Sequence, residues 1–162
     1  MIRRASFTIV LFLIVGVAQS NAQPGRVDVK AAAAVGQFYL DESFPDHFEL
    51  GASARIHLGS RWAIEPEFSY VDSNVDFLPD EWNYVFVTNV VRHFGDREAR
   101  AKPYWLVGGG VRFGGNAENV FVATGGIGVD VELSQRLFVF AEARGPAIRV
   151  AGGLGFAIGP TE

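Results

Sequence analysis

The sequence lacks several features that would each have indicated a class of protein. It contains no cysteine, so disulfide bonds cannot hold the domain and its stability must come from a core or a membrane. No run of lysine and arginine occurs along the chain, which argues against nucleic acid as a partner. Beyond the first residues, no apolar run approaches the roughly 20 residues that a transmembrane helix needs. Yet 49% of the residues are hydrophobic and the mean hydropathy is +0.17, so the apolar residues are dispersed along the chain.

Residues 1–22 have the organisation of a secretory signal peptide. Arg3 and Arg4 form a positive region, the apolar run Ile9–Val17 follows, and small residues stand one and three places before the predicted cleavage site after Ala22. A transmembrane anchor is the alternative, but an apolar run of about ten residues is too short to cross a bilayer as a helix. We therefore expect export and cleavage of residues 1–22.

The remaining domain, residues 23–162, has 12 basic and 18 acidic side chains, a net charge of −6, and its apolar residues recur with a period of two. In His47–Leu58 every even position is apolar and every odd position is polar or glycine. Such alternation predicts a β-strand with one apolar and one polar face. Ordinary strands have about five or six residues, whereas a membrane-spanning strand needs about nine to eleven.

Similar segments follow one another along the whole domain, separated by turn residues. The predicted strands are Val27–Leu40, His47–Leu58, Trp62–Asp72, Trp82–Phe94, Pro103–Phe113, Val120–Leu133, Leu137–Arg144 and Ile148–Ile158. This order predicts an all-β fold, an eight-stranded antiparallel up-and-down transmembrane β-barrel. With an even number of strands both termini lie on the periplasmic side, together with the turns at 59–61, 95–102 and 134–136. The loops at 41–46, 72–81, 114–119 and 145–147 then face outward.

The charged residues decide which face of the strands points inward. A soluble periplasmic, lipocalin-like binding barrel has an apolar interior and predicts the same alternation. Three observations favour the membrane orientation: the strands are of spanning length, lateral charges are few, and Trp62, Trp82 and Trp105 lie near strand starts, where interfacial aromatic residues occur. We therefore expect the apolar face to contact lipid and the charged face to line a narrow lumen.

Two segments carry a family resemblance. The stretch GGIGVDVELSQRLFVFAEAR (Gly125–Arg144) and the closing VAGGLGFAIG (Val150–Gly159) resemble the small eight-stranded outer-membrane β-barrels of the OmpA-membrane-domain and OmpX kind. This resemblance implies a porin-like monomer in the cell outer membrane, with outer-membrane lipid as its partner and with the barrel-assembly machinery and periplasmic chaperones as partners during biogenesis. Such barrels commonly end on an aromatic residue, whereas the last aromatic residue here is Phe156.

The lumen-facing charges are the candidate functional residues. They are Arg55, Glu65, Glu67, Arg112, Asp130, Glu132, Glu142, Arg144 and Arg149. Of these, Arg112, Arg144 and Arg149 are expected near the outer end of the barrel. The expected periplasmic group is Arg55, Glu65, Glu67, Asp130 and Glu132. A turn centred on Ser60 would place Arg55 opposite Glu65 as an ion pair.

The preferred interpretation of these charges is a paired network that fills the barrel, because buried charges must be paired. The alternative is a narrow pore, or a carrier for ions or small apolar molecules. We expect a structural or surface-interaction role without enzymatic activity or cofactor. The three histidines are expected at different heights in the barrel, with no serine placed for any of them to activate. The closest approach to a metal site is His57 with Glu65 or Glu67, but Arg55 would compete with a metal ion for these carboxylates.

Overall fold

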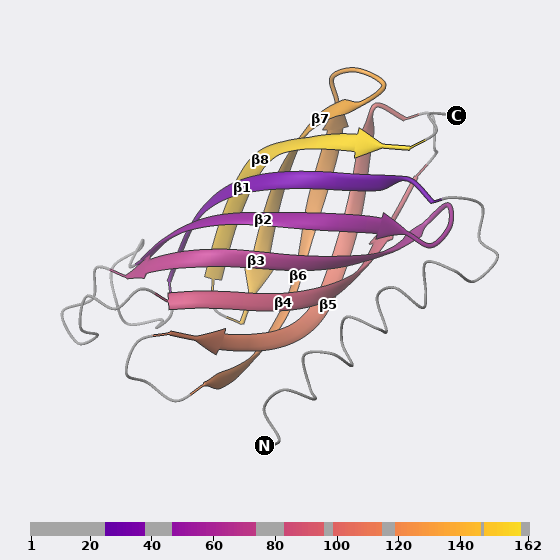
Figure 1. Ribbon diagram of the computed structural model, residues 1–162. Helices are drawn as coiled ribbons and strands as arrows, with labels where there is room; N and C mark the ends of the chain where they lie inside the picture. The colour runs from indigo at the N-terminus through magenta and orange to yellow at the C-terminus, as the bar shows by residue number, and fades with distance from the viewer. Residues whose placement is uncertain are drawn as a thin grey trace.

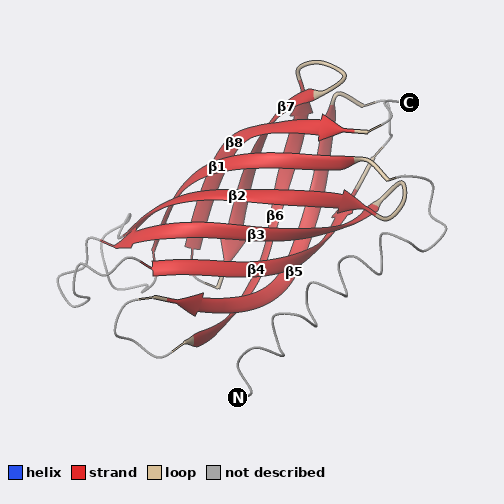
Figure 2. Ribbon diagram, viewed as in Figure 1, coloured by secondary structure: helices blue, strands red, loops and turns tan. Residues whose placement is uncertain are grey.

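The computed structural model describes residues 25–37, 47–73, 83–95, 99–114, 119–146 and 148–159. These residues form a closed barrel of eight antiparallel strands in which each strand pairs with its neighbours in sequence and β1 pairs with β8 (Figures 1 and 2). The strands are β1 (Val27–Gln37), β2 (His47–His57), β3 (Trp62–Ser73), β4 (Asn83–His93), β5 (Ala101–Phe113), β6 (Val120–Glu132), β7 (Leu137–Gly145) and β8 (Ile148–Ile158). The predicted all-β, eight-stranded fold is therefore confirmed. The predicted signal peptide, Trp82, the loop at 41–46 and most of the loop at 72–81 lie outside the described residues.

The barrel has two distinct ends. The start of β1, the end of β8 and the last residues of β2, β4 and β6 lie at one end, which we call the turn end. The last residues of β1, β3, β5 and β7 lie at the other, which we call the loop end. Trp62 is at the turn end, but Trp105 is the fifth residue of β5 rather than near its start, because β5 already begins at Ala101.

The turn between β2 and β3 sets their register as the sequence predicts. His57 pairs with Ala63 and Ile56 with Ile64, which centres the connection on Ser60. The regular pairing of these two strands is interrupted near Pro66, since proline has no N–H group to donate to a neighbouring strand.

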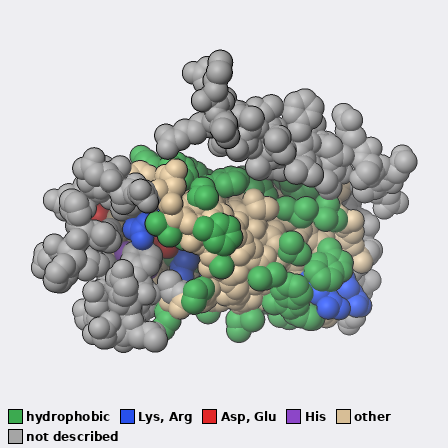
Figure 3. Space-filling model, turned by 90° about the horizontal axis from the view of Figure 1, so that it is seen from below, with side chains coloured by type: hydrophobic (Ala, Val, Ile, Leu, Met, Phe, Trp, Pro, Cys, Tyr) green, Lys and Arg blue, Asp and Glu red, His purple; other side chains and the backbone are tan. Residues whose placement is uncertain are grey.

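Charged and apolar side chains are distributed as a membrane barrel requires. On the outer wall Leu154 is 56% exposed, whereas Arg55 and Glu65 are 0% exposed in the lumen. Figure 3 shows hydrophobic side chains along one side of the barrel, with the few charged side chains in view toward its ends. This arrangement is the inverse of a soluble lipocalin-like cup, whose apolar side chains face inward, and it excludes that alternative as a fold. No helix in the described part of the chain has the length and apolar character to span a membrane.

The lumen is not lined by polar groups alone. Ala63, Val91, Tyr104 and Leu106 form a buried apolar cluster in it, and Phe138 from β7 is buried as well. Inward-facing valines of this kind explain why β4 carries apolar residues on both faces. Glycine makes room for the rings: a Cβ atom at Gly155 would lie 2.0 Å from Cζ of Phe138.

Candidate functional site: the charged lumen

Five strands contribute to a group of buried charges at the centre of the lumen, which we call the central knot. Lys30 Nζ on β1 donates to Glu65 Oε1 on β3 at 2.9 Å and to Glu142 Oε1 on β7 at 2.6 Å. The Arg55 guanidinium on β2 donates to Glu65 and also to Asp130 on β6. The predicted ion pair between Arg55 and Glu65 is therefore present. Because each cation joins two carboxylates, removing any one of them would leave charges buried without full compensation.

Aromatic and hydroxyl groups complete the central knot. The Tyr104 hydroxyl donates to Glu142 Oε1 at 2.6 Å, and the Ser53 hydroxyl donates to Glu65 Oε1 at 2.9 Å. The Arg55 guanidinium lies over the Tyr104 ring, 4.4 Å from its centroid, and Lys30 Nζ lies 4.0 Å from the centroid of the Phe140 ring. These contacts hold the cations in place by cation–π attraction as well as by ion pairing.

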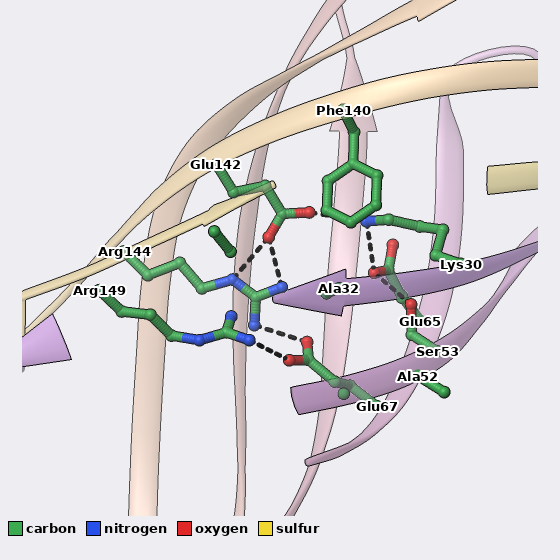
Figure 4. A pocket seen from close by; sticks show the side chains of 12 residues that line it. Lys30, Ala32, Ala52, Ser53, Glu65, Glu67, Phe140, Glu142, Arg144 and Arg149 are labelled. Carbon is green, nitrogen blue, oxygen red and sulfur yellow. Dashed lines mark hydrogen bonds and ion pairs between the residues drawn. The ribbon is translucent and has the colours of Figure 1, made fainter. Parts of the chain in front are cut away.

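Toward the loop end, Glu67 bridges two arginines on adjacent strands. Arg144 on β7 and Arg149 on β8 are direct register partners, a placement of like charges that is unfavourable without a shared anion. Glu67 supplies that anion, with Oε2 2.7 Å from Arg144 Nη1 and Oε1 2.9 Å from Arg149 Nη2 (Figure 4). Arg144 Nε also donates to Glu142 at 2.8 Å, which joins this group to the central knot. Arg149 Nε donates to Glu49 at 2.8 Å.

Toward the turn end, acidic and histidine side chains extend the network. His93 Nε2 lies 3.1 Å from Asp130 Oδ2 and His57 Nε2 lies 2.7 Å from Asp28 Oδ2. The two imidazole rings stack with their centroids 5.7 Å apart. Near the mouth, Lys102 Nζ donates to Glu132 Oε1 at 2.6 Å. Ion pairs and ring contacts thus run through the lumen from the turn end to the loop end.

The structure corrects the predicted separation of the charges by height. Glu67 was expected with the periplasmic group, but its side chain contacts those of Arg144 and Arg149 across the lumen, because strands on opposite walls of a barrel are staggered. Seven of the nine predicted residues are buried, whereas Glu132 and Arg112 are half-buried near opposite ends of the barrel.

Sequence analysis missed several members of the network. Lys30 and Asp28 belong to the alanine-rich β1, where the alternation is weak. Glu49 and Tyr104 fall on the polar faces of their strands, and that position is the signal that could have included them. Which of these side chains meet across the lumen depends on the stagger of the strands around the barrel, and alternation within one strand does not reveal that stagger.

The packed lumen leaves little free volume at the level of the central knot. A cavity of about 10 Å³ lies among Lys30, Glu65, Glu142 and the two arginines of Figure 4, enough for one water molecule at most. No group of three or more histidine, aspartate or glutamate side chains among the described residues could hold a metal ion. His57 pairs with Asp28 rather than with Glu65 or Glu67.

Solved structures share this fold at low sequence identity. A de novo designed transmembrane β-barrel is similar with a TM-score of 0.63 and 14% identity, over 84% of this chain and 98% of the designed chain. Ail, the attachment invasion locus protein of Yersinia pestis, in complex with the heparin analogue sucrose octasulfate, has a TM-score of 0.56 and 14% identity, over 83% and 99% of the two chains. Neisserial surface protein A has a TM-score of 0.51 and 15% identity, over 82% and 94%.

Sequence comparison gives no corresponding match: no protein-family model and no curated protein matches the chain. The structural likeness confirms the expected resemblance at the level of the fold. The chain has the fold of the small eight-stranded transmembrane β-barrels that occur in bacterial outer membranes.

Proposed function

We propose that this chain is a protein of the cell outer membrane, exported with cleavage of residues 1–22, with a structural or surface-interaction role and no enzymatic activity. The observation that carries the proposal is the pairing of an apolar outer wall with a lumen closed by buried ion pairs. A wall of this kind is stable only against lipid. The connections at the loop end, which would face outward, are where a surface partner would bind.

The packed lumen favours this role over that of a pore or carrier. A pore needs a continuous water-filled path, and a carrier of small apolar molecules needs an apolar chamber. Salt bridges among Lys30, Glu65, Glu142, Arg144 and Glu67 cross the lumen instead. We further propose that the barrel is monomeric, with lipid as its permanent partner and the barrel-assembly machinery and periplasmic chaperones as transient ones.

Location is tested by fractionation of cells that express the full chain, with gel electrophoresis of boiled and unboiled samples. We expect recovery in the outer-membrane fraction without residues 1–22, and a mobility difference between the folded and the boiled protein. Recovery as a soluble periplasmic protein without such a difference would contradict the proposal.

Closure of the lumen is tested by planar-bilayer recordings on protein whose folding has been verified on the same gels. The closed lumen predicts no unitary current steps above those of protein-free bilayers. Reproducible steps of one size would instead support the narrow pore.

A further inference from the structure

Arg92 is an unusual residue on the outer wall of the barrel. The outward-facing positions of the described strands carry charge at two places, Asp72 near the loop end and Arg92 near the turn end of β4. At the turn end, a patch of Lys and Arg side chains borders hydrophobic side chains (right-hand end of Figure 3).

Aromatic residues on β3, on β5 and directly after β4 frame Arg92. Trp62 on β3 and Trp105 on β5 are its register partners on either side, and their rings meet edge to face with centroids 5.7 Å apart. Arg92 Cζ lies 5.2 Å from the centroid of the Trp62 ring and 5.7 Å from that of Phe94. Cation–π attraction therefore fixes the guanidinium against the wall, at the depth where interfacial tryptophans mark the lipid headgroups.

The protein supplies no anion for this guanidinium within the described residues. Arg55, Arg144 and Arg149 in the lumen all contact carboxylates, whereas no carboxylate among the described residues pairs with Arg92. Its Nε is buried and has no hydrogen-bond partner there. A donor left in this state costs free energy, and the planar N–H fork of arginine is suited to phosphate oxygens.

We propose that Arg92, framed by Trp62, Phe94 and Trp105, binds the phosphate of an anionic phospholipid in the leaflet at the turn end. A lipid fits better than free phosphate because Trp62 and Phe94 are themselves 44% and 43% exposed and would be covered by acyl chains. Arg61 lies on the same rim, where its carbonyl oxygen accepts a hydrogen bond from His93 N at 2.8 Å, and it adds a second positive charge. The inference rests on the proposed function, which places the barrel in a bilayer.

Tryptophan fluorescence can report on this site directly. The chain has three tryptophans, so Trp82→Phe leaves only the pair beside Arg92. This variant is refolded into phosphatidylcholine vesicles that contain either brominated phosphatidylglycerol or brominated phosphatidylcholine, and quenching is expressed relative to the unquenched signal. We expect the anionic lipid to be preferred roughly fivefold, the effect of one arginine near a charged headgroup.

Variants separate the site from the general charge of the rim. Arg92→Gln should abolish the preference, and Arg92→Lys, which keeps the charge but loses the fork, should reduce it. Arg136→Gln, in an exposed turn at the same end, is the matched control and should leave it unchanged. Equal quenching by the two lipids, equal losses in the Arg92 and Arg136 variants, or removal of the preference by added inorganic phosphate would each overturn the proposed lipid site.

The same samples distinguish this proposal from the proposed function. If the parent variant shows no folded mobility shift in the vesicles, the membrane role itself is contradicted. If it folds and inserts but shows no lipid preference, only the Arg92 site is wrong.

Discussion

At the scale of single residues, the lumen is held by cations that each compensate more than one carboxylate. Arg55 is the central example, since it is 0% exposed and contacts both Glu65 and Asp130. An ion pair of this kind contributes little net stability relative to a well-packed apolar pair, but removal of one partner is costly. The network therefore makes folding depend on all its members together.

We predict that Arg55→Met lowers the free energy of unfolding by about 3–5 kcal/mol, because two buried carboxylates lose a cation. Lys102→Gln is the control, since the pair of Lys102 with Glu132 is partly exposed at the mouth and should contribute less than about 1 kcal/mol. Urea titrations of the protein in vesicles, read as folded fraction on unboiled gels, give both values.

The double variant Arg55→Met/Glu65→Met tests whether the two side chains act as a pair. In this variant Lys30 retains its ion pair with Glu142, and Asp130 retains its contact with His93. The decrease in the free energy of unfolding should therefore be smaller than the sum of the two single decreases by about 0.5–3 kcal/mol. Strict additivity would show that the contact between Arg55 and Glu65 does not contribute to stability.

Residue identity alone predicted part of this network. Arg55 and Glu65 could be paired from the turn between them, because register near a short connection follows from counting. Lys30 could not be paired with Glu142, since β1 and β7 are not neighbours and the contact passes through the lumen. Arg92 was not identified either, because a single outward-facing cation has no repeating pattern.

At the scale of strands, alternation predicted all eight elements and their faces. It did not predict which large apolar side chains fill the lumen, because that depends on side-chain size rather than on polarity. Phe138 and Phe140 point into the lumen although they are among the most apolar residues of β7. The partner of Phe138 is Gly155 on β8, so the space for the ring is created by the adjacent strand. Polarity patterns within one strand do not carry that information.

We predict that Gly155→Val destabilises the barrel by about 1–3 kcal/mol, because its side chain would overlap the buried Phe138 ring. Gly152→Val on the same strand is the matched control. It faces the outer wall, where a Cβ atom would lie 3.4 Å from its nearest neighbour, the Phe140 carbonyl oxygen, and the effect should stay within about 0.5 kcal/mol. Equal losses in the two urea titrations would show that β-propensity, and not the packing of Phe138, governs these positions.

At the scale of the whole molecule, the charged lumen and the apolar outer wall each set a condition for a stable fold. Charges can be buried in a barrel this narrow only if they neutralise one another, and apolar side chains can cover its outside only if lipid surrounds it. Aromatic residues lie toward both ends of β3 to β5: Trp62 and Trp105 are in the half nearer the turn end, and the stacked rings of Tyr84 and Phe113 are at the loop end. On the proposed function, the surrounding bilayer contributes to the stability of the fold.

The unfolding free energy of two arginine variants on β8 tests the central claim that this wall spans a bilayer. Leu154 near the middle of the strand and Ile158 at its turn end are almost equally exposed, at 56% and 53%. In vesicles, Leu154→Arg should cost about 2–4 kcal/mol and Ile158→Arg about 0–1 kcal/mol, because the cost depends on depth in the bilayer. If both variants instead lose the same amount, within about 0.5 kcal/mol, the wall does not cross a membrane and the account is contradicted.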